Sequence, residues 1–221
     1  AYASADVVGR GIDFLLVPLY LHFLAPEDYG ALALLFLLST FLKPVVRLGL
    51  DSGFFRIYYD LKSEERPRFA NTVAWFAAGV SASAFVGIWV FAAPVSELLF
   101  GHGGGVLWVR LVAVDLLASS FVFVPFALFR AEGRASLLST YSVIRHFANT
   151  VLKVILVLMG QGVTGVLISD AAASLLLALL LLFELRRRVA SGFDATPLKE
   201  TLRFGLPKVP HEMTVADIGR I

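Results

Sequence analysis

The sequence predicts an all-α polytopic membrane protein, and three observations support this fold class. Hydrophobic residues make up 58% of the 221 residues, only 16% are charged, and the mean hydropathy is +0.80. So much apolar content exceeds what one soluble core can bury. Six segments of bilayer length follow one another along the chain. The cationic residues between these segments gather in alternate loops, as expected of a multi-pass protein.

A window of about 20 residues locates six predicted spans. The third is the purest, because no charge lies between Phe69 and Ser96, and Trp75 and Trp89 lie toward its ends. Charges interrupt the first, second and fifth spans most. The six predicted spans are residues 2–24, 30–50, 69–94, 106–129, 137–159 and 163–185.

The connecting loops predict the orientation. The loops after spans two, four and six carry Lys and Arg, whereas those after spans one, three and five carry none. Since Lys and Arg stay on the cytoplasmic side, the N-terminus is predicted to be cytoplasmic. Topology alone explains these cations, which are Arg56, Lys62, Arg66, Arg68, Arg130, Arg134, Arg186, Arg187, Arg188, Lys199, Arg203 and Lys208.

A short amphipathic helix is predicted after the sixth span. Thr196 is placed as its N-cap and Pro197 as its first helical residue, with leucines at 198, 202 and 206 on one side. We expect this helix to lie at the membrane interface and to lead into a seventh span. The chain starts at Ala1 within one apolar segment and stops at Ile221 as another begins, which suggests a fragment.

Composition argues against several other classes. A net charge of +2 is too balanced for a nucleic-acid binder, and the absence of cysteine excludes disulfides and thiol chemistry. The four histidines show no ligand spacing, so neither a metal site nor another cofactor is expected. No serine, histidine and acid combination indicates hydrolysis, and we expect the protein not to be an enzyme.

Charged residues inside the spans are the strongest functional signal. Such a residue at the centre of a span costs about 2.5 to 3.5 kcal/mol, so a chain that keeps several is expected to turn them toward a wet cavity. From the predicted orientation, Arg10, Lys43 and Arg145 share one layer about 10 to 13 Å from the cytoplasmic face. Span five repeats polar residues at i, i+4 and i+8 with Arg145, Asn149 and Lys153.

Two interpretations of this layer stand side by side. The cations could be neutralised by nearby carboxylates, Asp13 for Arg10 for example, in pairs that only hold helices together. Alternatively they form a cationic chamber for an anionic group such as a diphosphate, whose oxygens suit the planar fork of arginine. Arg47 and Lys153 follow as further candidates for substrate binding, although Arg47 is also close enough to a membrane face to snorkel.

Three carboxylates within the spans are candidates for ion coupling. An acid in a low-dielectric cavity can take up and release a proton in a useful pH range. These acids are Asp13, Asp115 and Asp170, and the alternative role for each is that of an ion-pair partner.

Four short motifs in order along the chain resemble a known family. They are Phe23-Leu-Ala-Pro-Glu-Asp-Tyr-Gly-Ala-Leu-Ala33, Arg47-Leu-Gly-Leu-Asp-Ser-Gly-Phe-Phe-Arg-Ile-Tyr-Tyr59, Phe129-Arg-Ala-Glu-Gly-Arg-Ala135, and Phe204-Gly-Leu-Pro-Lys-Val-Pro210 followed by Ala216-Asp-Ile-Gly-Arg-Ile221. With this topology, the chain resembles the bacterial polysaccharide flippases of the Wzx type, whose superfamily also holds the MATE multidrug exporters and the lipid II flippases.

The resemblance implies a transporter of about 12 to 14 spans in two similar lobes around a central cavity. Such a protein would move an oligosaccharide linked to undecaprenyl diphosphate across the bacterial inner membrane by alternating access, with coupling to a proton or sodium gradient. Residues 1–185 would then be the six-span N-terminal lobe, residues 186–203 a basic cytoplasmic linker with the interfacial helix, and residues 204–221 the start of the second lobe.

Other functions stay open at this point. A drug or metabolite exporter of the same superfamily is one alternative, although a cationic chamber suits cationic drugs poorly. A membrane polymerase or ligase of polysaccharide assembly is another, although the predicted external loops are short. A purely structural membrane subunit is the third.

Overall fold

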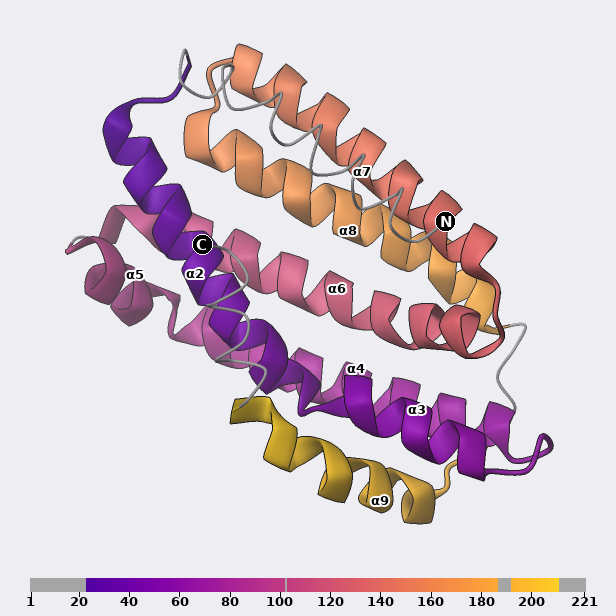
Figure 1. The fold of residues 1–221 in the computed structure, drawn as a ribbon. Coiled ribbons are helices and arrows are strands. Elements are labelled where there is room, and N and C mark those ends of the chain that lie inside the picture. Colours follow the sequence, from indigo (N-terminus) through magenta and orange to yellow (C-terminus); the bar gives the residue numbers. More distant parts are fainter. Residues whose placement is uncertain (1–22, 102, 187–191, 211–221) are drawn as a thin grey trace.

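The chain is helical nearly throughout the part that the structure describes. The computed structural model describes residues 23–101, 103–186 and 192–210. No strand occurs among them, so the predicted all-α class is confirmed. The helices are α2 (Pro26–Arg47), α3 (Leu50–Asp60), α4 (Arg66–Val90), α5 (Ala92–Phe100), α6 (Val106–Ala131), α7 (Ala135–Leu158), α8 (Gly162–Arg186) and α9 (Ala195–Gly205), with 3-10 turns at Gly103–Gly105 and Leu206–Lys208 (Figure 1).

Within the described residues, five helical segments are long and apolar enough to cross a membrane. Three of them, α6, α7 and α8, match the predicted spans 106–129, 137–159 and 163–185 to within two residues at each end. The predicted first span lies outside the described residues except for its last two. Hydropathy alone therefore locates the helices that carry most of the candidate site.

The predicted second span, residues 30–50, ends in the wrong place. Helix α2 stops at Arg47, and a second helix, α3, begins at Leu50 and runs beyond the predicted end. Leu48 and Gly49 both adopt the left-handed conformation, with φ of 50° and 68°, and separate α2 from α3. The Leu48 N–H donates a hydrogen bond to the carbonyl of Pro44 at 3.0 Å. Left-handed backbone costs a non-glycine residue roughly 1–2 kcal/mol, so tertiary contacts must hold Leu48 in place.

The predicted third span also runs past a break. The helix α4 ends at Val90, and α5 starts after Phe91 in a new direction (Figure 1). Pro94 is the third residue of α5 and has no N–H to offer the preceding turn. A single straight helix over 69–94 is therefore corrected to two helices.

Helix α6 lies at the centre of the described bundle, with α4 on one side, α8 on the other and α2 crossing it (Figure 1). Helix α7 packs along α8 in the opposite direction. Small residues let α6 and α8 approach closely, as in many membrane bundles. The buried small residues are Ala113, Ala118, Ser120 and Ala127 on α6 and Gly165, Ser169, Ala171, Ala173, Ser174 and Ala178 on α8.

The loops predicted to carry cations lie together. The turn between α3 and α4, the turn between α6 and α7, and the end of α8 all meet at one end of the bundle (Figure 1). The Tyr59 hydroxyl donates to the carbonyl of Ala131 at 3.3 Å, and the Asn71 amide donates to that of Gly192 at 2.9 Å. The structure thus reproduces the predicted clustering of these loops, and which membrane face they meet stays a prediction.

The predicted helix after span six exists as α9 and packs on α3 (Figure 1). Its cap is Asp194, not Thr196, because the Asp194 carboxylate accepts from the Thr196 N–H at 3.1 Å. Leu198 is buried among α3, α4 and α6 residues. At the crossing, the backbones of Gly49 and Gly205 touch, and a Cβ on either glycine would overlap the other's carbonyl.

We expect Gly205→Ala to lower the free energy of unfolding by about 1 to 3 kcal/mol, the usual cost of overpacking. Gly205 has φ of −77°, so alanine fits its backbone and only the overlap with Gly49 is tested. Gly87→Ala is the matched control, because a Cβ there meets open space and alanine favours a helix. Thermal unfolding of the purified protein in detergent measures both, and equal melting temperatures for Gly205→Ala and wild type would contradict the packing.

Candidate functional site

A cavity of about 420 Å³ lies among α2, α6, α7 and α8, in the membrane-spanning part of the described bundle. Its lining combines apolar side chains with charged and hydrogen-bonding ones. The lining residues are Phe36, Ser39, Lys43, Leu111, Val112, Asp115, Arg145, His146, Asn149, Lys153, Leu167 and Asp170.

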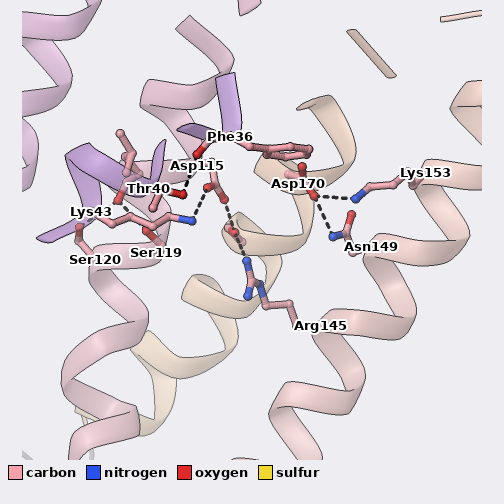
Figure 2. A network of polar contacts seen from close by, with 12 residues as sticks. Phe36, Thr40, Lys43, Asp115, Ser119, Ser120, Arg145, Asn149, Lys153 and Asp170 are labelled. Carbon is pink, nitrogen blue, oxygen red and sulfur yellow. Dashed lines mark hydrogen bonds and ion pairs between the residues drawn. The ribbon is translucent and has the colours of Figure 1, made fainter. Parts of the chain in front are cut away.

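One wall of the cavity is the polar row of α7. Arg145, Asn149 and Lys153 all line the cavity, which confirms that their spacing places them on one helix face. Because α8 runs antiparallel to α7, its Asp170 meets the far end of the row. The Lys153 Nζ lies 3.0 Å from Asp170 Oδ1, and Asn149 Nδ2 donates to the same oxygen at 2.9 Å (Figure 2).

A second chain of polar contacts crosses the cavity from α2 to α7. Lys43 Nζ lies 3.6 Å from Asp115 Oδ2 on α6. The other Asp115 oxygen accepts from the Ser174 hydroxyl on α8 at 2.5 Å. Ser174 Oγ in turn accepts from the Arg145 guanidinium at 3.1 Å. Two cations from opposite walls are thereby linked through one carboxylate and one hydroxyl (Figure 2).

The charges of the described lining do not balance. It holds three cations and two carboxylates, and each carboxylate is paired with a lysine. Arg145 forms no ion pair with any described residue and is held only by the neutral Ser174. Among the described residues, each lysine thus has a carboxylate partner, and Arg145 has none.

The two lysines differ in their exposure. The side chain of Lys43 is 40% exposed, whereas that of Lys153 is 9% exposed. Lys43 is thus open to a ligand in the cavity, and Lys153 is enclosed with its carboxylate.

Several predicted residues lie elsewhere. Arg47 does not line this cavity; it pairs with Asp51 at 3.2 Å, and its guanidinium carbon lies 5.9 Å from the centre of the Phe123 ring. Arg10 and Asp13 lie outside the described residues. Arg47 is the last residue of α2, one turn beyond Lys43, and its partner Asp51 lies past the break, in α3.

The candidate coupling acids Asp115 and Asp170 are both ion-pair partners in the structure. A coupling role for them stays a prediction. Within the described residues, no group of three or more His, Asp or Glu is placed to hold a metal ion.

Comparison with known proteins identifies the family. Residues 22–216 match the model of a family described as "Polysaccharide biosynthesis protein". The chain belongs to this family. The match covers α2 to α9, and therefore every described helix that lines the cavity.

A curated relative is the succinoglycan biosynthesis transport protein ExoT of Rhizobium meliloti (strain 1021). It is 25% identical to this family member over 158 residues, which cover 71% of the present chain. The same alignment spans only 31% of that relative. No solved structure matches the chain.

Sequence reasoning missed Ser174. In this member of the polysaccharide biosynthesis family it is completely buried and hydrogen-bonds to two lining residues, Arg145 and Asp115. A serine in an apolar helix is common in membrane proteins, and it carries no signal by itself. Its one sequence clue is the spacing of four residues from Asp170, which places both on the same face of α8.

We expect Asp170→Ala to destabilise the protein by about 3 to 5 kcal/mol, because Lys153 would keep a buried charge without its partner. Asp51→Ala is the matched control, since it also breaks an ion pair, but one with both side chains more than a third exposed. That change is expected to cost less than about 1 kcal/mol. Thermal unfolding compares the two, and similar losses would show that Lys153 does not depend on Asp170.

Proposed function

We propose that this chain contributes the first lobe of a flippase that moves a lipid-linked oligosaccharide across the bacterial inner membrane by alternating access. The observation that carries the proposal is a cavity at membrane depth in which one cation, Arg145, has no carboxylate partner among the described residues and lies opposite a half-exposed Lys43. An arginine kept inside a bilayer without a carboxylate partner is costly unless it serves a ligand or a water-filled path.

The proposed cargo group is the diphosphate that links the oligosaccharide to its lipid carrier, undecaprenol by resemblance. Arg145 lies ten residues from the first residue of α7, about 15 Å along the helix, so it sits well inside the span. A guanidinium can bond two phosphate oxygens at once, while an ammonium acts as a point charge. Arg145 and Lys43 could therefore bind one diphosphate from two walls, with Arg10 as a further proposed contact.

The comparisons support the direction of the proposal. The family description points to polysaccharide biosynthesis, and the curated relative is named as a transport protein. The alignment with less than a third of that relative supports a larger transporter, of which these helices form one lobe. In this proposal the N-terminus is cytoplasmic, and Asp13, Asp115 and Asp170 are the candidates for coupling to protons or sodium.

The test replaces Arg145 and Lys43 by alanine in the gene at its native locus and measures surface polysaccharide. Loss of a charged hydrogen bond is worth about 1.5 to 3 kcal/mol, so Arg145→Ala should reduce export at least about tenfold. Lys43→Ala should have a smaller effect, because Asp115 already compensates Lys43. Lipid-linked precursor should accumulate on the cytoplasmic leaflet.

The matched controls are Lys199→Ala and Arg203→Ala, which remove one cation each from exposed positions of α9 outside the cavity. Both should leave export near the wild-type level. The proposal fails if alanine at Arg145 and Lys43, at normal protein levels, leaves surface polysaccharide unchanged. If a deletion strain instead becomes sensitive to drugs with its polysaccharide intact, an exporter of the same superfamily is the better account.

A further inference from the structure

We infer that Ser174 is a positioning residue that keeps Arg145 available to a phosphate-type anion by holding the carboxylate of Asp115 away from it. The inference rests on the proposed function, because it concerns how the same cavity binds its anionic group. It adds a residue that no sequence motif indicates, and it specifies the ligand chemistry: a group that offers two oxygens to one guanidinium.

Only one assignment of donor and acceptor fits the two hydrogen bonds of the Ser174 hydroxyl. A serine hydroxyl has one proton, and Asp115 as a carboxylate and Arg145 as a guanidinium leave only one arrangement. Ser174 donates its proton to Asp115 Oδ1 at 2.5 Å and accepts an N–H of Arg145 at 3.1 Å. The hydroxyl therefore lies between the two charged groups and forms one hydrogen bond with each.

Without that hydroxyl, Asp115 and Arg145 would be free to pair directly. Carboxylate and guanidinium form two parallel hydrogen bonds when they meet, and that pair would cancel the charge of Arg145, which no described carboxylate balances. In the structure both Asp115 oxygens are occupied, Oδ1 by Ser174 and Oδ2 by Lys43. Asp115 is thus held in place without contacting Arg145.

The arrangement leaves a defined set of donors facing the cavity. Arg145 has five N–H groups, of which the described residues use one, and Lys43 is 40% exposed. Lys153, in contrast, is enclosed with Asp170 and offers little to a ligand. The remaining donors are one guanidinium and one ammonium. They suit a phosphate or diphosphate, because the guanidinium can bond two of its oxygens and the ammonium acts as a point charge.

The test titrates inorganic pyrophosphate into the purified full-length protein in detergent and measures the dissociation constant by calorimetry. Ser174→Ala should weaken binding about tenfold or more, although it removes no charge. Ser169→Ala is the matched control, because Ser169 lies on the same helix, is equally buried, and bonds only to backbone carbonyls of its own helix. It should bind pyrophosphate as the wild type does.

A second substitution distinguishes a positioning role of Ser174 from damage to the fold caused by Ser174→Ala. In the double variant Ser174→Ala with Asp115→Asn, the side chain at 115 has no charge to cancel Arg145, so pyrophosphate affinity should return to the wild-type value. Asp115→Asn alone should bind at least as tightly as wild type, even if Ser174→Ala does not fold. A residue with a merely structural role predicts no such rescue.

The outcomes distinguish the inference from the function on which it rests. If wild type binds pyrophosphate, Arg145→Ala loses binding and Ser174→Ala keeps it, the positioning role is overturned and the anion site stands. Weaker binding in Asp115→Asn, or no rescue in the double variant, also overturns the positioning role. If wild type binds no pyrophosphate, the anion site of the proposed function fails, and the role of Ser174 fails with it.

Discussion

Hydrocarbon offers no partners to a charged side chain, so every charge kept inside a span must be satisfied by the protein or by water in a cavity. Two ion pairs between helices meet this requirement. Asp170 of α8 pairs with Lys153 of α7, and Asp115 of α6 pairs with Lys43 of α2. Arg145 differs from these two lysines, because its partner among the described residues is a neutral serine and not a carboxylate.

The same constraint links the cavity to the remainder of the bundle. Small residues on α6 and α8 bring their backbones close enough for Ser174 to reach Asp115. The break at Leu48 and Gly49 ends the cavity helix α2 and turns the chain into α3, where Gly49 contacts Gly205 of α9. The segment after the sixth span is therefore packed directly against the break that follows the helix carrying Lys43.

Much of this arrangement could be predicted, since hydropathy locates spans and a spacing of four places residues on one face. That logic was right for Arg145, Asn149 and Lys153, which all line the cavity. It did not place Arg47, the other candidate on α2, because that side chain pairs with Asp51 across the break at Leu48 and Gly49, which hydropathy does not detect.

Which cation keeps a free charge also could not be predicted from the sequence. Spacing along one helix says nothing about the partner that a neighbouring helix presents. Lys43 and Arg145 look alike in the sequence, and they differ because α6 presents Asp115 to one while α8 presents Ser174 to the other. Only the packed structure shows which of the two cations has a carboxylate partner among the described residues.

The central claim is that the cavity is open to water and attracts anions, and the reactivity of one cysteine tests it most directly. The chain has no native cysteine, and Ser39 lines the cavity, so Ser39→Cys gives a single reporter. Its reaction rates with an anionic and a cationic methanethiosulfonate are compared after division by the rates of a free thiol in solution. We predict that the anionic reagent reacts faster, whereas a preference for the cationic reagent, or no reaction with either, would contradict the account.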